Sequence, residues 1–244
     1  MSSSDSFSSS GPQSAVATIS GSVESGIAGN YQFEIGELLR EAWAKTHGSK
    51  ATFVIAFVLY IAVMFVVEFF VGMVTDTFNE VGFDFFDVLS ELVTILVPEP
   101  MAAGLAILGL RRSAGVATSP MIVLRYFSLW VPIAILTVLI YILIAVGFFL
   151  LIIPGLYLIL AYTLALPLLV DKGLNPWEAM ETSRKALTHQ WFKVLGLILA
   201  LALINLATLV TLGIGLIWTI PMTYIAIGVL YQRVFGIEAA TLHP

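Results

Sequence analysis

Residues 127–170 read FSLWVPIAILTVLIYILIAVGFFLLIIPGLYLILAYTLALPLLV, a stretch of more than 40 residues without a charged side chain. A straight helix of that length, rising about 1.5 Å per residue, would reach about twice the roughly 30 Å thickness of a bilayer's hydrocarbon core. The stretch must therefore fold back on itself, and we expect the turn at Pro154-Gly155, helped by Gly147. It predicts two membrane-spanning helices joined as a hairpin.

The same reasoning applies on either side of this stretch. Residues 192–231 form a second long apolar block, with an expected turn at 211–215. Residues 51–74 and 88–110 each match the length of one crossing. The sequence therefore predicts an all-α integral membrane protein with six transmembrane helices in three hairpins, each preceded by an interfacial amphipathic segment.

Composition and charge agree with this fold class. Apolar residues make up 59% of the chain and charged residues 11%, whereas a soluble domain carries about 25% charged residues. All the cations fall at or beyond the ends of the predicted crossings and on the same side of them, which by the positive-inside rule places both termini in the cytoplasm of a bacterial inner membrane. The eleven cations are Arg40, Lys45, Lys50, Arg111, Arg112, Arg125, Lys172, Arg184, Lys185, Lys193 and Arg233.

Partner classes follow from the same composition. The net charge is −5 and no basic stripe lies away from the membrane edges, so we expect no nucleic-acid partner. Membrane lipids and other membrane proteins are the expected partners, and the oligomeric state stays open. The chain has no cysteine, which excludes disulfides and thiolate chemistry.

The chain divides into four parts by composition. The first part is rich in Ser and Gly and cannot bury enough apolar surface to order itself, so it is predicted to be disordered. The four predicted parts are a cytoplasmic tail at 1–30, an interfacial amphipathic helix at 31–50, the six-helix domain at 51–236 and a short cytoplasmic tail at 237–244.

The amphipathic helix is predicted from its apolar periodicity between Phe33 and His47, with Gly48 as its C-terminal stop. Its apolar face either lies on the bilayer surface, with Trp43 at headgroup level, or packs onto the transmembrane bundle. The residues of this face are Ile35, Leu38, Leu39, Ala42 and Trp43.

An internal repeat is the main organising feature of the predicted fold. The repeat units are 33–115, 116–173 and 174–236. Units two and three both open on a capping residue followed by proline, Ser119-Pro120 and Asn175-Pro176, which favours helix starts there.

Two polar residues lie deep in the predicted crossings and are the candidate functional positions. Glu99 lies between Pro98 and Pro100, where prolines loosen the helix, and Asn205 lies deep in the fifth crossing. We expect Glu99 to be protonated or hydrogen-bonded, with Asn205 and Thr223 as the candidate partners. Asn205 also has the simpler use of tying two helices together. Trp43, Trp177 and Trp191 are the predicted interfacial anchors.

Catalysis is not expected. The three histidines, His47, His189 and His243, all fall at or beyond the predicted cytoplasmic edge, and no nucleophile–base or metal-ligand motif is present. We therefore expect no catalytic residue, no cofactor and no metal site. The acidic segment from Asp76 to Asp87 carries four carboxylates, which either bind a hard cation or are tolerated outside the membrane, the second reading being favoured.

The C-terminal half carries a family resemblance. The segments that carry it are 151–155 (LIIPG), 166–173 (LPLLVDKG), 175–180 (NPWEAM), 183–185 (SRK) and 233–236 (RVFG). Over residues 145–236 the chain resembles an uncharacterised family of bacterial six-helix inner-membrane proteins, and is similar to the membrane region attached to some glycerophosphodiester phosphodiesterases. The resemblance implies the six-helix topology and lends no active site, since no phosphodiesterase domain is present.

These observations favour a non-catalytic inner-membrane protein, a scaffold or regulatory component acting through lipid or protein contacts. The alternative is a small transporter or channel that uses Glu99 near the middle of the bilayer. A third possibility is an accessory subunit of a lipid-handling complex.

Overall fold

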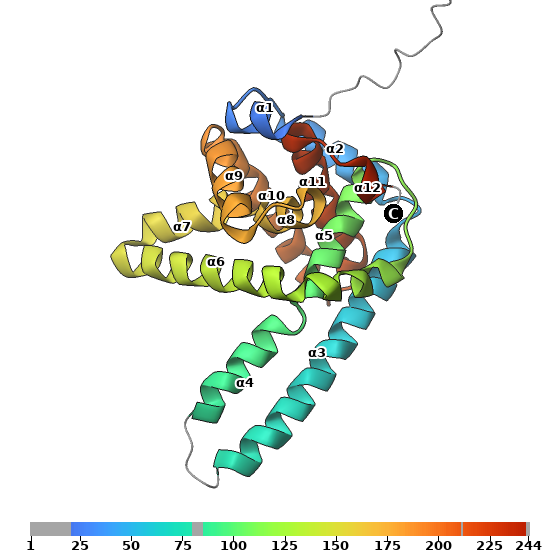
Figure 1. Ribbon diagram of the computed structural model, residues 1–244. Helices are drawn as coiled ribbons and strands as arrows, with labels where there is room; N and C mark the ends of the chain where they lie inside the picture. The colour runs from blue at the N-terminus through green and yellow to red at the C-terminus, as the bar shows by residue number, and fades with distance from the viewer. Residues whose placement is uncertain (1–20, 80–84, 211, 243–244) are drawn as a thin grey trace, which may run out of the picture.

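The computed structural model describes residues 21–79, 85–210 and 212–242, which form helices and no strand. The predicted all-α fold is therefore confirmed (Figure 1). The helices are α1 (Val23–Ile27), α2 (Ile35–Thr46), α3 (Lys50–Asn79), α4 (Phe85–Leu96), α5 (Glu99–Ser113), the 3-10 helix η1 (Pro120–Leu129), α6 (Trp130–Leu150), α7 (Ile152–Ala161), α8 (Ala165–Lys172), α9 (Pro176–Thr188), α10 (Trp191–Leu209), α11 (Leu216–Phe235) and α12 (Ala239–Leu242).

Five helical stretches of the described chain are long and apolar enough to cross a bilayer, which is compatible with a multi-pass membrane protein. Three of them combine two helices each: α4 with α5, η1 with α6, and α7 with α8. The stretches are Lys50–Asp76, Val88–Ser113, Pro120–Leu150, Ile152–Lys172 and Trp191–Leu209.

Helix α11 is long enough to be a sixth crossing but is not apolar enough to be counted with these five. Its C-terminal half lies in the core, where Ile225, Leu230, Tyr231 and Phe235 are completely buried. A helix surrounded by other helices does not need a continuous apolar surface, which explains why α11 can carry tyrosines and an internal proline.

Helices α5 and α11 approach each other more closely than ordinary side chains allow. A Cβ atom on Gly109 would collide with the carbonyl oxygen of Tyr224, and one on Gly228 would lie 2.5 Å from the carbonyl oxygen of Gly109. In lipid, helices associate through such close backbone contact because no hydrophobic force drives them together. The small-residue crossing thus fixes the centre of the fold.

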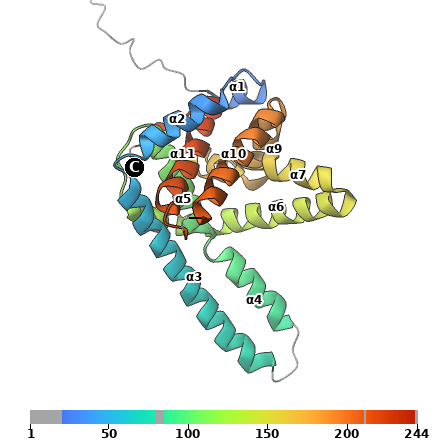
Figure 2. The same cartoon turned by 180° about the vertical axis from the view of Figure 1, so that it is seen from behind.

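Two hairpins extend from this centre in different directions. Figures 1 and 2 show that α3 and α4 run away from the body as one pair, while α6 and α7 leave it as another. The remaining helices form the body. Its polar end, as we use the term, consists of α1, α2, α8, α9, α12 and the C-terminal ends of α5 and α11.

The turn between α6 and α7 differs from the prediction. It lies at Leu151, whose backbone is extended (φ −166°, ψ 158°), and not at Pro154-Gly155. Pro154 falls in the first turn of α7, where a missing amide hydrogen costs the helix no bond. Gly147 and Gly155 instead let the two helices touch, since a Cβ on Gly147 would lie 3.0 Å from the Cα of Gly155.

The fourth predicted crossing is also interrupted. Helix α7 ends at Ala161 and α8 begins at Ala165. The hydroxyl of Ser183 on α9 donates to the carbonyl of Ala161 (2.6 Å) and accepts the amide of Leu164 (3.2 Å), so a buried side chain satisfies the broken backbone. By contrast, the turn predicted at 211–215 agrees with the structure, in which α10 ends at Leu209 and α11 begins at Leu216.

Order begins earlier than the predicted boundary at residue 30. Ser22 caps α1 and exchanges hydrogen bonds with Ser25. The glycines serve close packing: a Cβ on Gly21 would collide with the backbone of Val234, and one on Gly26 would lie 2.7 Å from the ring of Phe235. The small residues that indicate disorder in the sequence therefore allow this segment to pack closely against α11. Residues 1–20 of the predicted tail lie outside the described residues.

The predicted amphipathic helix at 31–50 is shorter, since α2 spans Ile35–Thr46. Of the two alternatives for its apolar face, the structure shows packing on the bundle: Leu38 and Ala42 are completely buried and α2 contacts α11 and α5. Trp43 points away from this contact and is 45% exposed. The capped starts at Ser119 and Asn175 are confirmed, although the first opens a 3-10 helix that continues into α6.

The α5–α11 crossing leads to a stability prediction. Gly109→Ala and Gly228→Ala should each destabilise the protein by about 1–3 kcal/mol or more, because the added methyl group meets backbone that cannot move aside. Gly72→Ala in α3 is the control, since an added Cβ there meets nothing within 4 Å. Thermal unfolding in detergent measures the difference. Equal melting temperatures for all three variants would contradict the crossing.

Candidate functional site at the break between α4 and α5

The second apolar stretch is interrupted between Leu96, the last residue of α4, and Glu99, the first residue of α5. Pro98 and Pro100 have no amide hydrogen, so carbonyl groups one turn earlier lose their helical partners. The carbonyl of Pro98 starts the new helix by accepting the amides of Met101 (2.9 Å) and Ala102 (3.1 Å). The expected loosening of the helix at these prolines is thus a complete break.

One of the freed carbonyls is satisfied from another helix. The indole nitrogen of Trp130, at the start of α6, donates to the carbonyl oxygen of Leu96 (3.2 Å). In a regular helix the amide of residue 100 would donate to this carbonyl, but Pro100 has no amide hydrogen. Sequence reasoning missed this role of Trp130, because a tryptophan near a predicted membrane edge is ordinarily read as an interfacial anchor.

The carboxyl group of Glu99 lies among side chains from three other helices. It lies near the buried Thr137 hydroxyl of α6 and near the phenols of Tyr60 in α3 and Tyr224 in α11. Glu99 also occupies the first turn of α5, where the positive end of the helix dipole favours a carboxylate. The break therefore positions one half-buried acid where four helices meet.

Asn205 does not join this cluster. Its amide donates to the hydroxyl of Thr223 (2.9 Å) and to the carbonyl of Leu201 (2.8 Å), and the Thr223 hydroxyl in turn donates to the carbonyl of Thr219 (2.8 Å). The expected contact between Glu99 and Asn205 or Thr223 is therefore wrong. Asn205 instead has the simpler structural role considered for it, a hydrogen bond that ties α10 to α11.

The three predicted interfacial tryptophans are all near the polar end but differ in exposure. Trp43 and Trp177 are exposed, as expected of side chains at headgroup level. Trp191 is partly buried, its ring packed between Tyr157 and Phe192.

The cations of the polar end bind helices together. Glu41 of α2 accepts from Lys45 (2.6 Å) and from Arg233 of α11 (2.7 Å), and Lys45 also donates to the carbonyl of Ser113 at the end of α5. Burial raises the pKa of Glu41, but these two hydrogen-bonded cations outweigh it and hold the pKa below its ordinary value. The residues read as orientation signals therefore also join α2, α5 and α11.

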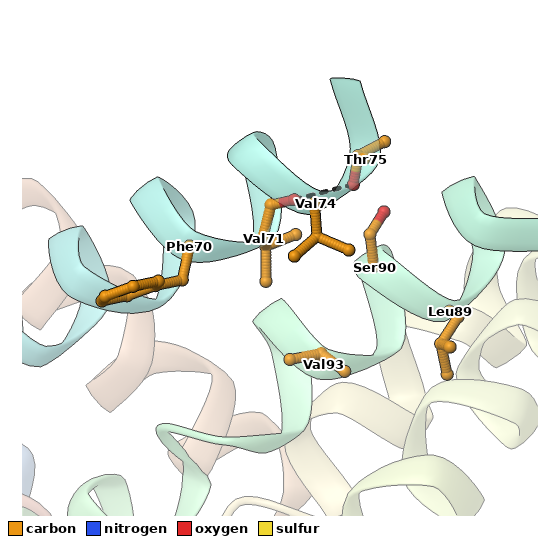
Figure 3. Close-up of a pocket in the computed structure, with 7 residues that line it drawn as sticks. All are labelled: Phe70, Val71, Val74, Thr75, Leu89, Ser90 and Val93. Atoms are coloured by element: carbon orange, nitrogen blue, oxygen red, sulfur yellow. Dashed lines mark hydrogen bonds between the residues drawn. The ribbon is translucent and has the colours of Figure 1, made fainter. Parts of the chain in front are cut away.

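A separate hollow lies between the helices of the first hairpin. Side chains from α3 and α4 surround a cavity of about 280 Å³, and Figure 3 shows them converging on it. Its lining is almost wholly apolar, and the Thr75 hydroxyl is turned to the carbonyl of Val71 (2.9 Å). Such a cavity suits a hydrocarbon chain and offers no chemistry. No signal in the sequence could have found it, because it depends on how the two helices pair. The lining residues are Phe70, Val71, Val74, Thr75, Leu89, Ser90 and Val93.

Metal ligands are not gathered in the part of the chain that the structure describes, where no group of three or more His, Asp or Glu side chains could hold an ion. The acidic segment from Asp76 to Asp87 is only partly within it: residues 80–84 lie outside the described residues.

Comparison of the chain with protein-family models, with curated proteins and with solved structures finds no match. The resemblance of residues 145–236 to a six-helix inner-membrane family therefore stays a prediction.

The Trp130 bond can be tested by removing one atom group. Trp130→Phe keeps an aromatic ring but leaves the Leu96 carbonyl without its donor. We expect a cost of about 1–3 kcal/mol, because in the proposed crossing this carbonyl faces lipid, where no water replaces the lost donor. Trp177→Phe is the control, since Trp177 is 60% exposed. Unfolding in detergent, followed by circular dichroism, compares them. A Trp130→Phe protein as stable as the control would show that the carbonyl needs no partner.

Proposed function

We propose that this chain is a non-catalytic, multi-pass protein of the bacterial inner membrane, a scaffold or regulatory component that acts through contacts with lipids or other membrane proteins. One observation carries the proposal. In the most apolar part of the stretch Lys50–Asp76, only 6% of the residues are buried within the molecule. A helix with so little internal packing must find its contacts outside the chain.

The exposed side chains of α3 support this reading. Phe65, Phe69 and Phe70 are between 55% and 72% exposed, far along the hairpin that leaves the body in Figures 1 and 2. Lipid chains or helices of another protein can cover such a surface in a membrane. The cavity between α3 and α4 adds an apolar recess of about 280 Å³ on the same hairpin.

The proposed topology has six crossings in three hairpins, with α11 as the sixth and both termini in the cytoplasm. Eight of the eleven cations lie on the helices of the polar end, which supports the orientation. The burial of α11 in the body explains how a crossing helix can fall below the apolarity of the other five.

Cysteine labelling tests the topology, because the native chain has no cysteine. Single cysteines at the exposed positions Ala44, Ala117 and Ala240 should react only after the membrane is permeabilised. Cysteines at the exposed hairpin ends Phe149 and Val210 should react from outside intact cells. Labelling of Ala117 from outside would contradict six crossings, and so would a Phe149 cysteine that reacts from the cytoplasmic side.

A second candidate function is transport of a proton or small cation through Glu99. A specific observation favours it: many transporters bind their substrates at broken helices near the middle of the bilayer, and Glu99 lies at such a break. Against it, Glu99 lies near the hydroxyl groups of Thr137, Tyr60 and Tyr224, and the cavities beside α3 and α4 and beside α3 and α11 are apolar.

Photo-crosslinking and flux separate the two functions. A photoreactive residue at Phe69 should give a discrete adduct with a lipid or a membrane protein, whereas one at Phe57, partly buried and stacked on Tyr60 at 6.1 Å, should crosslink within the chain. Glu99→Gln, which keeps a hydrogen-bonding group, should leave the Phe69 adduct unchanged. A proton or cation flux in proteoliposomes that disappears with Glu99→Gln in a folded protein would overturn the scaffold and establish transport.

A further inference from the structure

A second cavity, of about 610 Å³, lies at the polar end and is unrelated to the break at Glu99. It forms where the connection between α1 and α2 meets the connection between α9 and α10. Unlike the apolar hollow of the first hairpin, its lining combines polar, cationic and aromatic side chains. Its polar and aromatic walls include Tyr31, His189, Gln190, Trp191 and Lys193.

The walls are held in place by hydrogen bonds between distant parts of the chain. The Tyr31 hydroxyl donates to the carbonyl of Ala186 (2.9 Å), and the Gln190 amide donates to the carbonyl of Tyr31. His189 Nε2 lies 2.9 Å from the carbonyl of Ile27 and must therefore be the donor there. Burial raises the pKa of Tyr31 to about 12, so its phenol stays neutral and keeps donating at physiological pH. The cavity is thus preformed.

Two buried polar atoms in these walls have no hydrogen-bond partner among the residues that the structure describes. They are the indole nitrogen of Trp191, a donor, and the side-chain oxygen of Gln190, an acceptor. Leaving such groups unsatisfied costs free energy, so each can take a partner that the described residues do not supply. A ligand that satisfies both must carry an acceptor and a donor.

Lys193 adds a positive charge to the same walls. Its ammonium is 3.3 Å from the carbonyl of Phe33 and 3.7 Å from the carboxylate of Glu34. The Glu34 side chain is 74% exposed and that of Lys193 is 44% exposed, so this ion pair is weak and can be exchanged for a stronger one. A phosphate oxygen is a better partner for an ammonium group than an exposed carboxylate at that distance.

The position of the cavity points to a lipid. Helix α10 begins at the cavity with Trp191 and the 81% exposed Phe192, and aromatic pairs of this kind occur at headgroup level. Below them, Leu199, Leu203 and Leu206 of α10 are between 52% and 64% exposed and can face acyl chains. A headgroup in the cavity would therefore have its chains alongside an apolar helix.

We propose that the cavity between the α1–α2 connection and the start of α10 binds an anionic phosphoglycerol headgroup of a membrane lipid. Lys193 and the Trp191 indole bind the phosphate oxygens, and the Gln190 oxygen accepts a hydrogen bond from a glycerol hydroxyl. The site rests on the proposed function, since it names one lipid class through which that function operates.

Binding is measured with the purified full-length protein in detergent and the short-chain lipid dioctanoyl phosphatidylglycerol. Lys193→Gln should weaken binding about tenfold or more, because it removes a charge-assisted hydrogen bond. Trp191→Phe keeps the ring and removes only the donor, so about a threefold loss or more is expected. Lys185→Gln is the matched control: Lys185 lies on α9, pairs with Glu181 at 3.4 Å and does not line the cavity.

Two further probes decide the source of the phosphate. Dioctanoyl phosphatidylcholine, which is zwitterionic and has no headgroup hydroxyl, should bind more weakly than phosphatidylglycerol. Equal binding of the two lipids, or unchanged affinity in both Lys193→Gln and Trp191→Phe, would overturn the site. Full competition by inorganic phosphate at about the affinity of the lipid would instead show a free-anion site and overturn the lipid assignment.

Two controls distinguish a loss of lipid binding from a loss of folding and from a failure of the scaffold function. Circular dichroism reports whether each variant keeps its helices, and if Lys193→Gln does not fold, Trp191→Phe decides alone. The Phe69 crosslink tests the scaffold on a different hairpin. If the Phe69 adduct does not form although phosphatidylglycerol binds, the scaffold function is contradicted and the lipid site stands. If the adduct forms but no lipid binds, only the proposed lipid site is contradicted.

Discussion

The close crossing of α5 and α11 is the contact on which the rest of this fold depends. Gly109 and Gly228 bring two backbones together where no side chain fits, and both helices are buried around that point. Helix α2 then packs on the outer face of α11, and η1 packs on α5, where a Cβ on Gly104 would collide with the backbone of Val123. Even α1 is held by the end of α11. Because lipid supplies no hydrophobic force between helices, this crossing takes the place that an apolar core has in a soluble protein.

The α5–α11 crossing also explains which apolar surfaces stay uncovered. Helices α5 and α11 use their surfaces on each other, so the α3–α4 and α6–α7 pairs leave the body with most of their apolar side chains outward. That imbalance is the physical basis of the proposed scaffold role. The break at Pro98 fits the same picture, since it lets α5 turn into the centre while α4 stays with α3, and Trp130 satisfies a carbonyl group that the change of direction exposes.

The polar end has two layers of interaction. Inside, Asp171 accepts the Tyr231 hydroxyl (2.7 Å) and the amide of Glu238 (3.1 Å), which attaches the last described residues to α8 and α11. Outside, Glu41, Lys45 and Arg233 join three helices through partly exposed charges. Exposed ion pairs are individually weak, so the buried hydrogen bonds of Asp171 and Ser183 contribute more to the stability of the polar end than the exposed charges do. The cavity proposed to bind a headgroup lies beside this end, whose hydrogen bonds help to hold its walls in place.

The sequence by itself determined the fold class, the long apolar stretches, the capped starts at Ser119 and Asn175 and the disturbance of the helix at Pro98-Glu99-Pro100. Each of these follows from local composition, periodicity or the chemistry of one residue type, which act within a few turns of chain. Only the tertiary structure decided that α2 packs on the bundle, that Glu99 meets Thr137, that Asn205 pairs with Thr223 and that residues 21–30 are ordered. Those outcomes depend on which helix faces meet, and a uniformly apolar helix does not encode its facing side in its pattern. The Leu151 turn has the same cause: Gly147 and Gly155 act by letting α6 and α7 touch, a contact that exists only after both helices have formed.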